Sequence, residues 1–211
     1  MQTFSYRSVS TVEEALAALA SPTARALAGG TDLIPMVREG RRQADLVVDV
    51  KGIPELGRLE IDAQGNLTIG AAVALHRVYG HPEVARRWPG LVDAASLIGG
   101  TAVQGRATLG GNLCTASPAG DSIPALIVHG ATLIVAGPAG RRSVPVAAFC
   151  TGPGRTVLGP GELLIAIQVP APRPRSGAAY LRFIPRTEMD IAVASSGVAL
   201  QLDAEGHIAA I

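Results

Sequence analysis

Residues 24–33, Ala-Arg-Ala-Leu-Ala-Gly-Gly-Thr-Asp-Leu, pass from a short apolar stretch through two glycines into a segment of helical character. We predict a strand over residues 24–27, a tight turn at Gly29 and Gly30, and a helix from Thr31 to Arg38. Glycine leaves the backbone open to an anion, and a helix start offers free N–H groups. The stretch predicts an α/β unit with an anion-binding turn, although a turn with positive φ is the simpler explanation for a lone Gly-Gly pair.

A second glycine pair strengthens the anion-binding hypothesis. Gly110 and Gly111 follow Thr108 and lead through Asn112 into Ala-Ser-Pro-Ala-Gly-Asp at residues 116–121. Both pairs stand beside small hydroxyl or amide residues, and two such loops suit a diphosphate. Neither pair fits the spacing of a nucleoside-triphosphatase P-loop or of a Rossmann G-x-G-x-x-G turn.

The remaining pattern predicts an α+β fold. Residues 10–13, Ser-Thr-Val-Glu, match a capping box, so a helix is expected from near residue 11 to before Pro22. Strands are predicted at 46–50, 66–73 and 131–136, and helices at 82–100, broken at Pro89, and at 123–129. Three further strands, at 162–169, 178–184 and 191–203, are predicted to form a β-meander. A subdomain boundary is expected near residue 60.

Composition excludes several classes of function. The 211 residues carry a formal net charge of +1, with no basic run that would indicate binding of nucleic acid. The apolar stretches are interrupted by Pro, His and Gly, so no membrane span is expected. The N-terminus has no pattern of a secretory signal, which makes the cytoplasm the expected compartment. Two cysteines, Cys114 and Cys150, predict neither an iron–sulfur nor a zinc site.

Three motifs together carry a family resemblance. They are the two glycine segments and a third segment, Tyr-Leu-Arg-Phe-Ile-Pro-Arg at 180–186 followed by Glu-Met-Asp-Ile-Ala at 188–192. In this order they resemble the FAD-binding (medium) subunit of the molybdenum hydroxylases, the family of xanthine dehydrogenase and carbon monoxide dehydrogenase. The resemblance spans nearly the whole chain.

The resemblance implies an FAD-binding fold of the vanillyl-alcohol oxidase type. In such a fold a small N-terminal α/β subdomain, here residues 1–60, faces a larger subdomain with an antiparallel sheet, here residues 61–211. Members of the family continue into a further C-terminal domain, which we expect to be absent from this chain. Some relatives carry an aromatic residue where this chain has Ile98, so an aromatic contact with the flavin is not expected from that position.

The resemblance also implies the residues of an FAD site. Backbone groups of both glycine segments are expected to bind the diphosphate, and Asp121, Leu164 and Arg182 are expected near the flavin. Each of these three has a structural alternative: an N-cap for Asp121, a core position for Leu164 and an exposed strand position for Arg182. The expected cofactor-binding residues are Ala26, Leu27, Ala28, Gly29, Gly30, Thr31, Asp32, Leu33, Thr108, Gly110, Gly111, Asn112, Thr115, Ser117, Asp121, Leu164 and Arg182. No catalytic or metal-binding side chain is expected.

The implied function is electron transfer by an oxidoreductase subunit. Electrons from a molybdopterin-binding large subunit are expected to reach FAD through a [2Fe-2S] small subunit and to leave to an external acceptor such as NAD or dioxygen. Two alternatives remain open at this point. One is an assembly subunit without cofactor, and the other is a self-sufficient flavin oxidoreductase of related fold.

Overall fold

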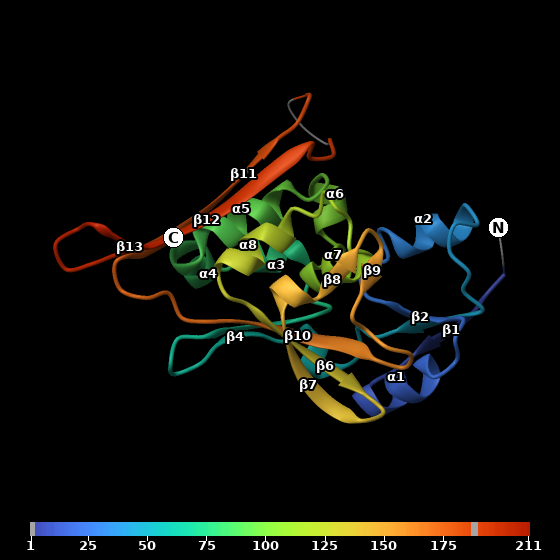
Figure 1. The fold of residues 1–211 in the computed structure, drawn as a ribbon. Helices are drawn as coiled ribbons and strands as arrows, with labels where there is room; N and C mark the ends of the chain where they lie inside the picture. The colour runs from blue at the N-terminus through green and yellow to red at the C-terminus, as the bar shows by residue number, and fades with distance from the viewer. Residues whose placement is uncertain (1–2, 187–189) are drawn as a thin grey trace.

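The structure, a computed structural model, describes residues 3–186 and 190–211. Two residues of the third motif, Glu188 and Met189, lie outside this part of the chain. Figure 1 shows the N-terminal elements on one side of the molecule and a helical layer between two sheets on the other. No helix among the described residues is long and apolar enough to cross a membrane.

The N-terminal unit is a small parallel sheet with two helices. Its elements are β1 (Ser5–Ser8), α1 (Val12–Leu19), β2 (Ala24–Leu27), α2 (Leu33–Arg38) and β3 (Leu46–Asp49). The strand order is β1-β3-β2, and β3 pairs in parallel with both neighbours. The predicted strand at 24–27 and the glycine turn are confirmed, and the predicted helix is present but begins at Leu33, two residues later than Thr31. In a parallel sheet the loop after β2 lies at the carboxyl edge, where α/β folds bind ligands.

The capping box of α1 lies one residue later than predicted. Thr11 is the N-cap, because its Oγ1 accepts a hydrogen bond from the amide of Glu14 at 3.1 Å. The Glu14 carboxylate accepts in return from the amides of Ser10 and Thr11. Sequence alone allows either Ser10 with Glu13 or Thr11 with Glu14, since both pairs have the required spacing.

The second sheet is antiparallel and lies at the centre of the main core. Its strand order is β4-β5-β10-β6-β7. The strands are β4 (Leu59–Ile61), β5 (Leu67–Gly70), β6 (Thr132–Gly137), β7 (Gly140–Pro145) and β10 (Leu163–Val169). The helices are α3 (Leu75–Tyr79), α4 (Pro82–Arg87), α5 (Pro89–Leu97), α6 (Thr101–Gln104), α7 (Leu109–Thr115) and α8 (Ser122–Val128). Short elements complete the unit: η1 (Pro54–Gly57), η2 (Val146–Ala148), β8 (Cys150–Gly152) and β9 (Arg155–Thr156).

The predicted β-meander is wrong in its first strand. β10 pairs with β5 and β6 in the second sheet, and its first five residues are buried because both faces are covered. The meander consists instead of β11 (Ser176–Phe183), β12 (Ala194–Leu202) and β13 (Ile208–Ala210). The Pro-rich connector at 170–174 carries the chain from one side of the helices to the other (Figure 1). A local pattern of strands and turns does not specify which strands pair.

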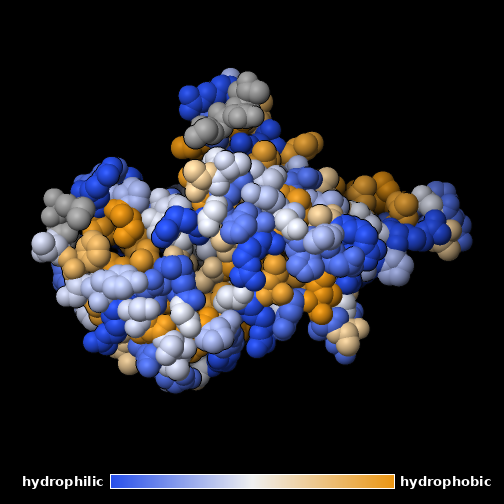
Figure 2. Space-filling model, turned by 180° about the vertical axis from the view of Figure 1, so that it is seen from behind, coloured by the Kyte–Doolittle hydropathy of each residue, from blue (hydrophilic) through white to orange (hydrophobic). Residues whose placement is uncertain are grey.

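The third sheet buries one face and exposes the other. Its inner face packs on α5 and α8, and the backbone of Gly197 lies against the carbonyl of Pro124. Its outer face is apolar: Leu181 is 76% exposed and Phe183 is 65% exposed. Figure 2, seen from behind, shows apolar residues on the segments that project beyond the body of the molecule.

Candidate functional site

The structure brings the first glycine segment, residues 26–33, into contact with the second segment, residues 108–117, and with Arg106 just before it. The Nε of Arg106 donates a hydrogen bond to the carbonyl of Gly29 at 3.2 Å. A Cβ added to Gly29 would lie 2.1 Å from the carbonyl oxygen of Arg106, so only glycine permits this approach of the two backbones. Further along, the Oγ1 of Thr115 donates to the Oδ2 of Asp32 at 2.9 Å. These contacts fix the turn after β2 against α7.

The first glycine segment presents backbone donors that the protein does not use. Within residues 3–186 and 190–211, the amides of Gly29, Gly30, Thr31 and Asp32 donate no hydrogen bond. Gly30 has a φ of +76°, a conformation that favours glycine. Four successive free N–H groups before a helix suit an anion with several oxygens. The segment therefore fits the diphosphate of a dinucleotide.

The second glycine segment is helical, although it was expected to be a loop. Gly110 and Gly111 lie in the first turn of α7, and the N-cap Thr108 accepts a hydrogen bond from the Gly111 amide at 2.8 Å. A Cβ on Gly110 would lie 2.5 Å from the carbonyl oxygen of Ala71, so this glycine is required for packing. A Cβ on Gly111 would approach the Thr108 hydroxyl alone, at 3.1 Å. The two glycines therefore have different roles.

Asp121 and Arg182 form a buried ion pair. The Nη1 of Arg182 lies 3.2 Å from Oδ2 of Asp121, and the exposed fractions of the two side chains are 8% and 10%. Asp121 is the N-cap residue of α8 by position but makes no side-chain capping bond, and the exposed strand position considered for Arg182 is wrong because its side chain is buried. The same Nη1 also donates to the carbonyl of Leu97, the last residue of α5, where a cation is favoured. The Nε of Arg182 is buried and has no partner among the described residues.

Tyr180 is the third member of this cluster. It was not among the site residues expected from the sequence. Its hydroxyl donates to Oδ1 of Asp121 at 2.7 Å, and the side chain is 2% exposed. Burial, together with this hydrogen bond, raises the pKa of Tyr180 to about 12. The available signal was the period of a strand, because residues two apart on β11 share a face and Arg182 was already a candidate.

The other expected residues lie in three different settings. The Oδ1 of Asn112 accepts from the hydroxyl of Ser122 at 2.7 Å, and the Ser117 hydroxyl accepts from the Ala119 amide at 3.3 Å. Both therefore order the segment that connects α7 to α8. Leu164 is 2% exposed in β10 and belongs to the main core. In the first segment, Leu27 and Leu33 pack in a small apolar cluster with Val37. Ala28 packs against the main core instead, and Ala26 is exposed in β2.

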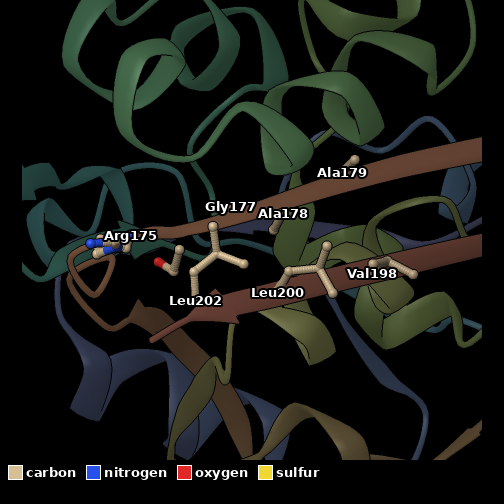
Figure 3. Close-up of a pocket in the computed structure, with 8 residues that line it drawn as sticks. Arg175, Gly177, Ala178, Ala179, Val198, Leu200 and Leu202 are labelled. Carbon is tan, nitrogen blue, oxygen red and sulfur yellow. The ribbon is translucent and has the colours of Figure 1, made fainter. Parts of the chain in front are cut away.

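The sheet of β11 and β12 also carries an open groove, which contains no residue of either glycine segment. Gly177, Ala179, Val198 and Leu200 are among the residues that line it (Figure 3). Arg175 is the one charged residue of its lining, at the end of the groove. The groove is therefore apolar and does not offer the donors that a diphosphate requires.

Comparison with known proteins agrees with the motifs. A family model described as the FAD binding domain in molybdopterin dehydrogenase matches residues 2–172. The putative xanthine dehydrogenase FAD-binding subunit of Escherichia coli (strain K12) is 32% identical over 201 residues, which cover 94% of this chain and 69% of that protein. The carbon monoxide dehydrogenase medium chain of Hydrogenophaga pseudoflava is 33% identical over 200 residues, with the same coverage.

Solved structures show that the fold is shared as well. A carbon monoxide dehydrogenase from Hydrogenophaga pseudoflava that lacks the Mo-pyranopterin moiety superposes with a TM-score of 0.93 at 32% identity, over 99% of this chain and 72% of that one. Quinoline 2-oxidoreductase from Pseudomonas putida 86 superposes with a TM-score of 0.88 at 30% identity, over 96% and 70% of the two chains. The chain therefore belongs to the FAD-binding subunit family of the xanthine and carbon monoxide dehydrogenase-type molybdenum hydroxylases, and it is an FAD-dependent oxidoreductase component.

Proposed function

We propose that FAD lies between the N-terminal unit of β1, β2 and β3 and the rest of the chain, with the subdomain boundary near residue 60 and the diphosphate on the first glycine segment. The single observation that carries this proposal is the run of four free amides at residues 29–32. Asp32 is held away from the diphosphate by Thr115, which binds its carboxylate. The N-terminal end of α7 adds a positive helix end close to the same turn.

The Asp121–Arg182 pair is proposed to lie beside the isoalloxazine ring. Bound FAD supplies the redox chemistry, accepting and releasing electrons at this ring. The Arg182 guanidinium places a fixed positive charge in a water-poor setting, where it favours negative charge on a neighbouring group. Its free Nε–H offers a further hydrogen bond, and Asp121 keeps the guanidinium oriented. Protein groups therefore orient the ring and tune it, while none needs to act as a nucleophile or base.

The route of the electrons is proposed from the relatives. We place a molybdopterin-binding large subunit and a [2Fe-2S] small subunit upstream of this chain, because two similar proteins are medium chains of carbon monoxide dehydrogenases. The chain holds two cysteines, fewer than the four that a [2Fe-2S] cluster usually takes. An external acceptor such as NAD or dioxygen receives the electrons afterwards.

Hydrogen exchange tests the proposed site directly. The amides of residues 29–32 are expected to exchange quickly without FAD and slowly with FAD, because bound phosphate oxygens would accept their hydrogen bonds. The amides of β13, far along the chain, serve as the internal control and should not change. An absorption spectrum that shows no flavin after addition of FAD would overturn the proposed function. Bound FAD without protection at residues 29–32 would overturn the assignment of the diphosphate site.

A further inference from the structure

Two hydrogen bonds made by neighbouring residues, Asp121 and Ser122, lie between Tyr180 and the second glycine segment. The Tyr180 hydroxyl binds Asp121, whose neighbour in sequence, Ser122, donates to Asn112 in α7 at 2.7 Å. The chain at residues 121–122 therefore contacts β11 through Asp121 and α7 through Ser122. A displacement of Asp121 would therefore disturb both the hydrogen bond to Tyr180 and the contact of Ser122 with Asn112.

The Asp121 carboxylate needs more than one donor because it is buried. Arg182 approaches both carboxylate oxygens through the same nitrogen, Nη1, at 3.3 Å and 3.2 Å. These are long contacts for a charge-assisted hydrogen bond. The Tyr180 hydroxyl, at 2.7 Å, makes the shortest contact with Asp121. The tyrosine, more than the arginine, therefore fixes where the carboxylate lies.

Tyr180 also supplies this hydrogen bond without adding charge. Burial and the bond to Asp121 keep the phenol protonated far above neutral pH. The cluster consequently contains one positive group, one negative group and one neutral donor. The hydrogen bond from the Tyr180 hydroxyl partly screens the negative charge of the Asp121 carboxylate. The carboxylate therefore offsets less of the positive potential of Arg182.

We propose that Tyr180 is a positioning residue for the flavin, acting through Asp121 on the guanidinium of Arg182. This inference rests on the proposed function, which sets Arg182 beside the isoalloxazine ring. Loss of the Tyr180 hydroxyl leaves Asp121 to neutralise Arg182 more fully. The reduced, more negative flavin is then less stabilised, and its midpoint potential shifts to a more negative value.

The test is the midpoint potential of the FAD-loaded protein, purified with the subunits that accompany it and titrated against reference dyes. Tyr180→Phe is compared with wild type and with Tyr79→Phe as a matched control. Tyr79 also loses one hydrogen bond on this change, because its hydroxyl donates to Gln104 at 3.1 Å. We expect a negative shift for Tyr180→Phe, no shift for Tyr79→Phe and a change in FAD affinity of less than about threefold in either variant.

Asp121→Asn alone provides a second measurement that does not require the phenylalanine variant. It removes the negative charge and is expected to shift the potential to a more positive value. In the Asp121→Asn background, Tyr180→Phe should then have little further effect, since it acts through the carboxylate. An unchanged potential in Tyr180→Phe, or an equal shift in Tyr79→Phe, would overturn the positioning role. A wild-type protein that binds no FAD would instead overturn the proposed function.

Discussion

Thr115 donates a hydrogen bond of 2.9 Å to the carboxylate of Asp32, 83 residues earlier in the chain. Asp32 precedes the first turn of α2, and Thr115 ends α7, so one contact sets the two glycine segments relative to each other. The pair is exposed, and a hydrogen bond in water contributes only about 1 kcal/mol to stability. Its effect is therefore expected on the geometry of the site more than on the free energy of unfolding.

Thr115→Val tests this relationship, because valine has the same shape and lacks the hydroxyl. Asp32 is then free to turn toward the diphosphate, and like charges repel. We expect the dissociation constant of FAD to rise by up to roughly tenfold, the equivalent of about 1.4 kcal/mol. The midpoint of urea unfolding of the FAD-free protein should change little. Thr68→Val, on β5 in the second sheet, is the control, and an equal loss of affinity in both variants would contradict the assignment.

The elements near the first glycine segment could be predicted from sequence because their signals are local. The apolar stretch at 24–27, the two glycines and the helix that follows are contiguous, and each matched the structure. The pairing of β10 with β5 and β6 depends instead on partners far from it along the chain, and the contacts of Asp121 with Tyr180 and Arg182 join residues about 60 positions apart. Spacing along the chain does not encode such contacts, so Tyr180 was quoted in a motif but not expected as a site residue, and without the family resemblance Asp121 resembled an ordinary helix cap.

The two glycines of α7 are predicted to respond differently to alanine. Gly110→Ala should lower the free energy of unfolding by more than about 2 kcal/mol, because its Cβ would overlap the backbone of Ala71 and overpacking is costly. Gly111→Ala meets only a hydroxyl and gains up to about 1 kcal/mol of helix propensity. It should therefore fold as well as wild type and bind FAD more weakly if the diphosphate lies against that turn. Urea unfolding and FAD titration measure the two effects separately.

Breaking the Asp121–Arg182 pair should destabilise the protein strongly. Asp121→Ala leaves a buried guanidinium without its counter-ion, which typically costs about 3–5 kcal/mol. Replacing both residues, as Asp121→Leu with Arg182→Met, removes the uncompensated charge and should recover much of this loss. The comparison is made on the FAD-free protein by urea unfolding. A double variant no more stable than the single one would show that the cluster is held by something other than the ion pair.

Alkaline pH should lower the free energy of unfolding, because Tyr180 of the third sheet is stabilised in its protonated form. Its pKa of about 12 in the folded protein exceeds the ordinary value of 10.0, because the phenol is buried and binds Asp121. Folding therefore gains stability below pH 10 from the protonated phenol. As pH rises from about 10 toward 12, the unfolded chain loses this proton first, and the free energy of unfolding falls by at most about 1.4 kcal/mol per pH unit. Tyr180→Phe should be less stable at neutral pH and should show a shallower decline in this window, measured by urea unfolding at successive pH values.

Tyr6→Phe is the contrasting variant, because the pKa of Tyr6 is also raised, chiefly by its hydrogen bond to Asp49, but its side chain is 58% exposed. If both substitutions make the pH-dependent fall in the free energy of unfolding equally shallow, burial of Tyr180 is not the cause of the lost stability at alkaline pH.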